Sequence, residues 1–526
     1  MSLAVLAAMT AGAAGAQVSD AQSQAVDAVF ARYAGTAVPG CAVAVAKDGR
    51  TILDRAYGMA DLETGTRATP ASIYESGSVS KQFTAAAILL LARDGKLRLD
   101  DDIRKYLPEM PDYGAPVTVG QLIHHTSGLR DWGAVAAMSG WPRNSRVADN
   151  ADVLALAAQQ RGLNYPPGAH YTYSNTNFNL AAIIVARVSG QSFAAFTDAR
   201  ILRPLGMKDS SWRENYARVV PGRATAYARD GGAYVIDQPI EDAHGNGGLL
   251  TTTADMIRWN AALDADTLGP GFTAEMEKVG VLSTGTKIEY AAGLRVTQRD
   301  GRREVAHSGS TGGYRAWLGR YPAEKLSVAL LCNASDANPV DSGRRVADAF
   351  LPKTAAVARA AGPLPTGGVY LSGLTGLPVE IAVRGATLTA DGATLTPAGA
   401  GRWQRGDATY VFDAKDGLTV EAVGDRVRYV RATPPSAANL EGFAGRYCGV
   451  DNDFCLIVTW DETGALSFIP SSRPGMAAQP LTPLFADGFA AGNRNVLRFQ
   501  RDGAGRVTGL RYHDDRAYGV EFARAK

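Results

Sequence analysis

Three short groups of residues, far apart in the chain, carry side chains that together could cleave an acyl bond. The groups are Ser78-Val79-Ser80-Lys81, Tyr173-Ser174-Asn175 and His307-Ser308-Gly309-Ser310. A serine hydroxyl becomes a nucleophile when a neighbouring base takes its proton, and a lysine amine can be that base when burial or nearby cations keep it neutral. The three groups therefore predict nucleophilic catalysis.

Ser78 and Lys81 share one face at the start of a predicted helix. Their spacing of three places the side chains one turn apart, and the apolar run at residues 83–92, which ends before Gly95, predicts the helix itself. The helix N-terminus adds backbone N–H groups and the positive end of a dipole. Taken alone, the pair also fits a helix cap followed by a solvated lysine.

The other two groups add the remaining functions of such a site. Tyr173 and Asn175 project to one side of a turn or short extended segment, although a structural turn is the simpler interpretation of that segment alone. Gly309 would let a substrate approach the backbone closely and leave the Ser310 N–H facing it. His307 by itself also fits a packed or surface histidine.

Strands at both ends of the first two thirds of the chain must position these groups. Residues 41–46 and 51–58 form a predicted hairpin, and residues 314–321 and 326–331 form another. Helical segments lie between them. This order predicts an α+β domain in which an antiparallel sheet, assembled from distant pieces, is flanked by helices.

The last third of the chain has a different sequence pattern. After an Ala/Gly/Pro-rich linker at residues 353–365, short alternating runs at 379–383, 386–389, 410–412 and 426–430 predict an all-β sandwich or barrel. A second linker at 433–436 introduces a similar region. Gly368-Val369-Tyr370 matches Gly445-Arg446-Tyr447, and Leu395-Thr396-Pro397 matches Leu481-Thr482-Pro483, so the two regions are interpreted as a diverged repeat.

Composition excludes several classes of protein. The 526 residues include 54 Lys+Arg against 52 Asp+Glu, without a basic run, so we expect no nucleic-acid partner. No stretch is apolar enough for a membrane span. Four cysteines exclude a Cys-rich zinc module, His124 and His125 are adjacent, and no His-Glu-x-x-His occurs, so we expect neither a metal nor another cofactor. The oligomeric state stays open, a homodimer included.

The first residues are typical of an export signal. Residues 3–16 are small and apolar, end in Ala14-Gly15-Ala16 and precede a polar segment, so we interpret residues 1–16 as the remnant of a signal peptide. The basic segment that normally opens such a signal is missing, so its true start is expected upstream; a frayed Ala/Gly terminus is the alternative. A periplasmic or secreted protein can form disulfides, and Cys448 and Cys455 flank a turn-rich stretch that they could clamp.

Order, spacing and context of the three groups resemble the serine β-lactamase and penicillin-binding protein family, above all its class C-like, peptidase S12-type branch. The supporting segments are Ser80-Lys81-Gln82-Phe83-Thr84, His125-Thr126-Ser127-Gly128-Leu129, Pro167-Gly168, Gly247-Gly248-Leu249 and Thr252-Thr253-Ala254-Asp255-Met256. With its two trailing β regions, the whole chain is similar to the D-stereospecific aminopeptidases. The resemblance implies a catalytic domain at residues 17–352 and β-barrel domains at 366–432 and 437–526.

The resemblance also implies a role for each site residue. Ser78 is the nucleophile that forms an acyl-enzyme, while Lys81 and Tyr173 share the general-base and general-acid work in an order left open. The backbone N–H groups of Ser78 and Ser310 form the oxyanion hole. Asn175 orients the substrate or Lys81, and His307 adds a polar wall that a proton would make cationic. Cys41 and Cys332 are expected to pair, because the family's first and last strands are antiparallel neighbours.

The leading hypothesis is an exported serine peptidase that acts on short D-amino-acid peptides or amides, as a D-aminopeptidase or a D-Ala-D-Ala carboxypeptidase does. An esterase or β-lactamase on the same machinery, and a non-catalytic peptidoglycan-binding relative, are the alternatives. In the aminopeptidases, a loop of the last barrel places an acidic residue in the active site. Residues 488–496, interpreted as that loop, contain no Asp or Glu, although Asp487 precedes them. A more permissive enzyme is therefore expected.

Overall fold

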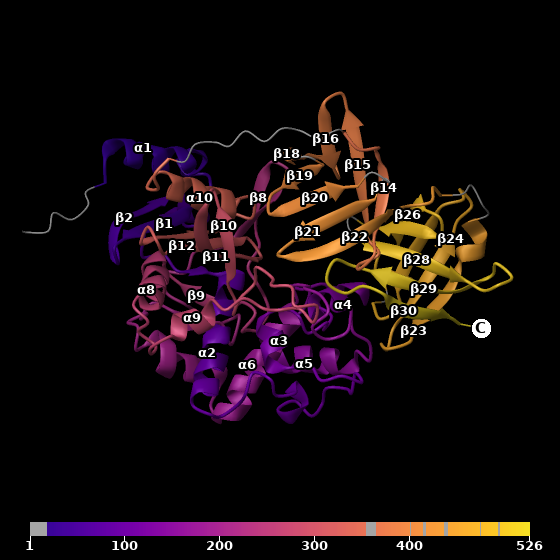
Figure 1. The fold of residues 1–526 in the computed structure, drawn as a ribbon, viewed down its shortest axis with the longest axis horizontal. Coiled ribbons are helices and arrows are strands. Elements are labelled where there is room, and N and C mark those ends of the chain that lie inside the picture. Colours follow the sequence, from indigo (N-terminus) through magenta and orange to yellow (C-terminus); the bar gives the residue numbers. More distant parts are fainter. Residues whose placement is uncertain are drawn as a thin grey trace, which may run out of the picture.

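The chain forms three bodies, and the first of them carries the predicted site. The computed structural model describes residues 18–353, 364–399, 401–413, 417–435, 440–473, 475–492 and 495–525. Figure 1 shows a mixed helix-and-strand domain, an orange domain of strands and a yellow barrel, both β domains lying on one side of the first. The predicted signal segment at 1–16 and most of the linker after residue 353 lie outside the described residues.

A six-stranded antiparallel sheet is the frame of the first domain. Its order is β10-β11-β12-β13-β1-β2, so strands from the two ends of the domain are neighbours in its middle. The strands are β1 (Cys41–Lys47), β2 (Arg50–Tyr57), β10 (Arg295–Arg299), β11 (Arg302–Thr311), β12 (Tyr314–Tyr321) and β13 (Leu326–Cys332). Both predicted hairpins and the α+β class are confirmed.

Helices cover both faces of this sheet. On one face, α1 (Asp20–Val29) and α10 (Pro339–Asp348) pack over an apolar layer that includes Trp317. On the other face, α8 (Thr253–Asp264) lies between the sheet and α2 (Lys81–Arg93). Helix α2 is buried from Lys81 to Leu91, which explains its continuous apolar sequence. Its Phe83 ring lies 4.4 Å from that of Trp259.

Short elements complete the first domain. The other helices are α3 (Val119–Ile123), α4 (Trp132–Met138), α5 (Asn150–Gln159), α6 (Asn175–Ser189), α7 (Phe193–Thr197) and α9 (Phe272–Met276). The other strands are β3 (Met59–Asp61), β4 (Thr66–Arg67), β5 (Tyr74–Glu75), β6 (Ser211–Trp212), β7 (Tyr227–Asp230), β8 (Ala233–Ile236) and β9 (Leu249–Thr251). Within the described ranges no single helix is long and apolar enough to cross a membrane; Asn175–Ser189 and Phe193–Leu202 reach the required length only together, across a 79° bend.

The second body is a nine-stranded antiparallel sheet that curls on itself. Its order is β17-β16-β15-β14-β22-β21-β20-β19-β18. The strands are β14 (Gly368–Ser372), β15 (Pro378–Arg384), β16 (Thr387–Ala390), β17 (Ala393–Thr394), β18 (Thr396–Gly399), β19 (Arg402–Arg405), β20 (Ala408–Phe412), β21 (Leu418–Ala422) and β22 (Asp425–Arg431). Because Leu395 alone separates the two end strands, the ends of the sheet meet and its apolar side chains face inward.

The third body is a closed antiparallel barrel. Its strands are β23 (Gly445–Gly449), β24 (Cys455–Trp460), β25 (Leu466–Pro470), β26 (Gln479–Phe485), β27 (Gly488–Ala491), β28 (Asn495–Arg501), β29 (Val507–His513) and β30 (Val520–Arg524). Aromatic and aliphatic side chains fill its interior. The expectation of all-β antiparallel, barrel-like domains behind the α+β domain is confirmed.

The predicted repeat has a structural counterpart in the first strand of each β body. Tyr370 and Tyr447 are both fully buried, and each hydroxyl donates to the carbonyl four residues earlier, at 3.0 and 2.7 Å. An arginine from the last strand of the same body, Arg431 or Arg524, lies 5.8 Å from the ring centre in each case. The same local arrangement is thus built twice.

Two disulfides join strand partners. Cys41 is bonded to Cys332 between β1 and β13, and Cys448 to Cys455 between β23 and β24. The second bond closes a loop that carries Asp451, whose carboxylate accepts from Arg130 Nη1 of the first domain at 2.6 Å. The disulfide therefore holds a loop that docks the barrel on the catalytic domain.

We expect purified, unreduced protein to show no titratable thiol after denaturation and four after reduction. All four cysteines are paired in the structure, and a paired sulfur does not react with a thiol reagent. The measurement is a thiol titration in denaturant with and without reductant. Two thiols without reductant would show that one of the bonds does not form, and peptide mapping would identify it.

Candidate active site

Two glycines allow the turn that carries Ser78 to lie directly against β11. Gly77 opens the 3-10 turn Gly77–Ser80 with φ of +50°, a conformation that favours glycine. A Cβ atom on Gly77 would lie 2.7 Å from the Ser310 nitrogen, and one on Gly309 would lie 3.0 Å from the Ser78 nitrogen. The backbone nitrogens of Ser78 and Ser310 therefore lie together where the turn touches β11, as an oxyanion hole requires.

The Ser78 hydroxyl is in contact with both predicted acid–base groups. Its Oγ lies 3.0 Å from Lys81 Nζ and 2.7 Å from the Tyr173 hydroxyl. Lys81 reaches it from the next turn of the same segment, and Tyr173 comes from the extended segment before α6. Residues separated by about a hundred positions in the sequence thus meet at one oxygen atom.

The surroundings of Lys81 favour a neutral amine. Its side chain is fully buried, and burial, followed by repulsion from Arg143 and Arg516, holds its pKa well below the usual value. Nζ lies 2.9 Å from Asn175 Oδ1 and 2.5 Å from the Asn246 carbonyl oxygen. Both partners are acceptors, so they take the two N–H groups of a neutral amine, and its lone pair is left for the Ser78 hydroxyl.

Tyr173 keeps its proton. Burial raises its pKa to about 12, so the hydroxyl donates to Ser78 Oγ. The His125 ring packs 4.4 Å from the tyrosine ring, and Arg516 lies 5.1 Å from its centre. Of the two groups that share the acid–base work, Lys81 is therefore the one in its basic form.

Two buried side chains hold the segment from Tyr173 to Asn175 in place. His125 Nδ1 accepts from the Ser174 backbone N–H at 3.2 Å. Asp131 accepts from the Asn175 backbone N–H at 2.6 Å and also caps α4. These contacts position the Asn175 amide on Lys81 at the start of α6.

The contacts of His307 fit a neutral imidazole, whereas the sequence suggested a wall that a proton would make cationic. Its Nδ1 lies 2.6 Å from the Ser308 carbonyl oxygen, which only accepts, so Nδ1 carries the proton. Nε2 then accepts from the Tyr290 hydroxyl at 2.9 Å. Burial, reinforced by the nearby Lys81, lowers the pKa of His307 to about 3.

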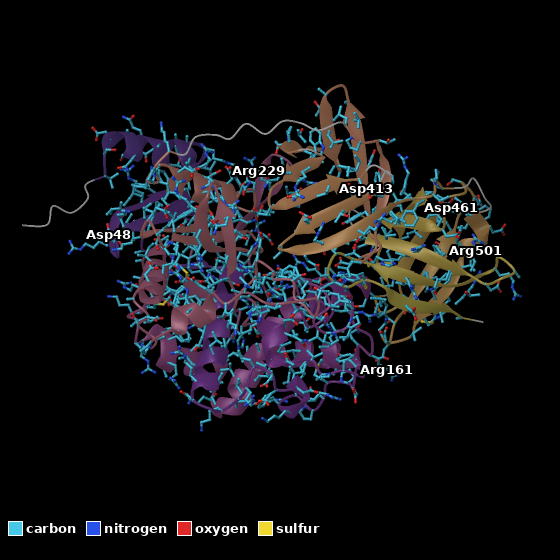
Figure 2. All side chains as sticks on the ribbon, viewed as in Figure 1. Asp48, Arg161, Arg229, Asp413, Asp461 and Arg501 are labelled. Atoms are coloured by element: carbon cyan, nitrogen blue, oxygen red, sulfur yellow. A yellow bond between two sulfur atoms is a disulfide. The ribbon has the colours of Figure 1, made fainter. Side chains whose placement is uncertain are left out.

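The prediction that residues 488–496 are the barrel loop at the site is wrong. Gly488–Ala491 is β27 and Asn495–Arg501 is β28, residues 493 and 494 lying outside the described residues. Asp487 forms an ion pair with Arg501 at 2.9 Å, and Figure 2 shows Arg501 on the side of the barrel away from the catalytic domain. These strands complete the barrel wall instead.

A different barrel loop, residues 514–519 between β29 and β30, reaches the site (Figure 1). Arg516 of this loop borders a cleft of about 610 Å³ together with Ser78, Tyr173 and Asn175. The Tyr518 hydroxyl lies 2.8 Å from Thr172 Oγ1. All three bodies meet here, because Val423 of the second body borders the same cleft.

The structure brings the predicted residues Ser78, Lys81, Tyr173, Asn175, His307, Gly309 and Ser310 together around this cleft. Sequence reasoning did not assign roles to Asp131, His125, Asn246, Tyr290 or Arg516. Of these five, Asp131, His125 and Asn246 could have been found from the sequence, since they lie in or beside segments that resemble the family. In the described part of the chain, no three His, Cys, Asp or Glu side chains are grouped to hold a metal ion.

We expect Tyr173→Phe to lower kcat/KM roughly 10²- to 10⁴-fold, the range for loss of one positioned acid–base group. Phenylalanine keeps the ring between His125 and Arg516 but removes the hydroxyl that reaches Ser78. The melting temperature should stay close to that of the wild type. Steady-state kinetics with thermal melts are the measurement, and activity within threefold of wild type would exclude Tyr173 from proton transfer.

Comparison with known proteins agrees with this geometry. The Beta-lactamase family matches residues 26–352. A D-aminopeptidase of Gluconobacter oxydans (strain 621H) is 31% identical over 361 residues, which cover 68% of this chain and 67% of that protein. One of Brucella melitensis biotype 2 (strain ATCC 23457) is 28% identical over 531 residues, covering 95% and 98%. The octameric penicillin-binding protein homologue from Pyrococcus abyssi has a TM-score of 0.58 and 25% identity, covering 78% of this chain and 99% of that chain.

Proposed function

Because the chain belongs to the beta-lactamase family, we propose that it is a serine hydrolase that forms an acyl-enzyme on Ser78 and cleaves amides or short peptides of D-amino acids. The observation that carries the proposal is the contact of one hydroxyl oxygen with the Tyr173 hydroxyl and with Lys81 Nζ, a buried amine whose pKa is held well below its usual value. The D-aminopeptidases among its relatives support the D configuration of the substrate.

In the proposed acylation, the neutral Lys81 takes the proton of Ser78 while Oγ attacks the substrate carbonyl carbon. The carbonyl oxygen becomes negative and accepts from the backbone N–H groups of Ser78 and Ser310. Collapse of this intermediate breaks the C–N bond. The leaving nitrogen receives the proton of the Tyr173 hydroxyl, and the Lys81 ammonium, whose Nζ lies 4.8 Å from the centre of the Tyr173 ring, returns to that tyrosine the proton it took from Ser78.

Deacylation repeats the same steps with water. A water molecule attacks the ester carbonyl of the acyl-enzyme and gives its proton to the neutral amine of Lys81. The Ser78 oxygen leaves, regains a proton and releases the acid. The neutral His307 and Tyr290 add polar walls without a charge of their own at neutral pH.

A substrate panel tests the proposal. It consists of the p-nitroanilides of D-Ala and L-Ala, a D-Ala-D-Ala peptide, nitrocefin and p-nitrophenyl acetate. We expect the D-anilide to be cleaved and its L enantiomer to react at least tenfold more slowly. Hydrolysis of nitrocefin or the acetate alone would instead identify a β-lactamase or an esterase, and failure of a fluorophosphonate to label Ser78 would identify a non-catalytic relative.

We also propose that the protein is exported to the periplasm or secreted. Two disulfides support this, because such bonds persist in oxidising compartments. The test is cell fractionation followed by N-terminal sequencing of the mature protein. Recovery of unprocessed, fully reduced protein from the cytoplasm would contradict it.

A further inference from the structure

The cleft beside Ser78 has cationic walls. Its described lining includes four arginines and no Asp or Glu. The arginines are Arg143, Arg295, Arg315 and Arg516. A free amino group on a substrate would therefore meet no carboxylate there, whereas a negatively charged group would meet several guanidinium groups.

Three of the four arginines already have acceptors. Arg143 pairs with Glu241, Arg295 with Glu289 and Asp407, and Arg315 donates to the carbonyl oxygens of Gly312 and Tyr314. Within the described ranges the Arg516 guanidinium has no hydrogen-bond acceptor, and its ion-pair neighbour Asp515 is 4.0 Å away. Arg516 is thus the cation of the cleft that is still able to bind an anion.

The backbone of Arg516 is held firmly, although its guanidinium has no acceptor among the residues that the structure describes. Its carbonyl oxygen accepts from the Asp131 N–H at 3.1 Å and from Asn164 Nδ2 at 2.9 Å. Its N–H donates to Asp514 Oδ1 at 2.9 Å, and the next turn is tied by the Tyr518 N–H to Asn164 Oδ1 at 3.1 Å. The guanidinium is therefore presented at a defined place, which lowers the entropic cost of binding.

That place adjoins the reacting groups. The guanidinium lies 5.1 Å from the centre of the Tyr173 ring, whose hydroxyl contacts Ser78. On its other side is a second cavity of about 320 Å³, which shares Tyr173 and Arg516 with the cleft and whose lining includes the carboxylates Asp425 and Asp515. Arg516 stands between the two spaces, and its side chain is 40% exposed.

We propose that Arg516 binds a carboxylate of the substrate, so that this enzyme prefers anionic substrates over those with a free amino group. The planar guanidinium matches a carboxylate with two parallel hydrogen bonds. The carboxylate can belong to the acyl part of the substrate or to its leaving group. The proposal rests on the proposed hydrolase function and names the substrate class within it.

The test compares charge at a constant scissile bond. On the acyl side the substrates are D-Ala p-nitroanilide, its N-acetyl form and its N-succinyl form, which carry a cation, no charge and a carboxylate. On the leaving side they are N-acetyl-D-Ala-D-Ala and its C-terminal amide. The proteins are wild type, Arg516→Ala, Arg516→Lys and the control Arg511→Ala, which removes a 48% exposed arginine paired with Glu521 on the same hairpin.

In one of the two series, we expect wild type to favour the carboxylate over the neutral substrate roughly 10- to 100-fold in kcat/KM, the range for a charge-assisted pair. Arg516→Ala should lose this preference, so that its kcat/KM falls roughly 10- to 100-fold more for the carboxylate substrate than for the neutral one. Arg516→Lys should keep part of the preference for the carboxylate, and the control Arg511→Ala should keep all of it. Equal rates on neutral and anionic substrates, or a preference for the amine, would overturn the proposal.

Arg516 also faces Lys81 and Tyr173, so a general electrostatic role must be separated from recognition. An equal loss on all substrates in Arg516→Ala, with a shifted pH profile, would assign it that role and overturn the proposal. Calorimetry on Ser78→Ala protein separates failure of this proposal from failure of the hydrolase function, because it measures binding whichever bond is cleaved. N-acetyl-D-alanine should bind at least tenfold more tightly than its amide. Adding Arg516→Ala should remove this difference in affinity. Equal binding overturns the proposal.

Discussion

Ser78→Ala will lower hydrolysis of every substrate by at least about 10⁴-fold, because it removes the proposed nucleophile, on which the proposed proton transfers converge. The free energy of unfolding should change by less than about 1 kcal/mol, since the half-buried hydroxyl is small, Lys81 keeps its contacts with Asn175 and Asn246, and Tyr173 borders the cleft. The measurements are kcat/KM and denaturant unfolding. Retention of more than one per cent of activity would mean that another group attacks the substrate.

Ser80→Ala is the matched control. The Ser80 hydroxyl lies in the same turn but faces the core, where it contacts Ser76 Oγ at 3.1 Å and accepts from the Leu249 N–H at 3.1 Å. Its removal leaves a buried donor without a partner, which costs roughly 1–3 kcal/mol. The two variants should therefore show opposite patterns, with activity lost at Ser78 and stability lost at Ser80.

Lys81→Met will lower kcat/KM roughly 10³-fold, because no base then takes the proton of Ser78. It will also change how stability depends on pH. The pKa of Lys81 in the folded protein lies well below its value of about 10.4 in an unfolded chain. Between the two values the unfolded state binds a proton that the native state does not, so stability rises with pH.

Methionine abolishes this proton difference. In the window between the folded and unfolded pKa values, the slope of unfolding free energy against pH should fall by up to one proton, or about 1.4 kcal/mol per pH unit. Denaturant unfolding from pH 7 to 10 measures it. Lys325→Met, at a side chain 72% exposed, is the control and should keep the wild-type slope. An unchanged slope in Lys81→Met would show that the native protein carries a charged Lys81.

The sequence alone determined what depends on local spacing. A serine and a lysine three apart before an apolar run specified that the two side chains meet, because a helix turn places them together whatever surrounds it. Alternation and turn residues specified the sheet hairpins. The family resemblance extended this to Tyr173, Asn175 and the paired ends of the sheet.

Only the tertiary structure decided the charges at the site and which barrel loop borders the cleft. The neutral state of His307 follows from its burial near Lys81, which no local pattern reports. The identity of the barrel loop depended on contacts such as that between the Asp131 N–H and the Arg516 carbonyl, across almost four hundred residues. Such long-range contacts arise from how three separately patterned bodies pack, and hydrophobic periodicity within each body carries no information about which of its loops will face another.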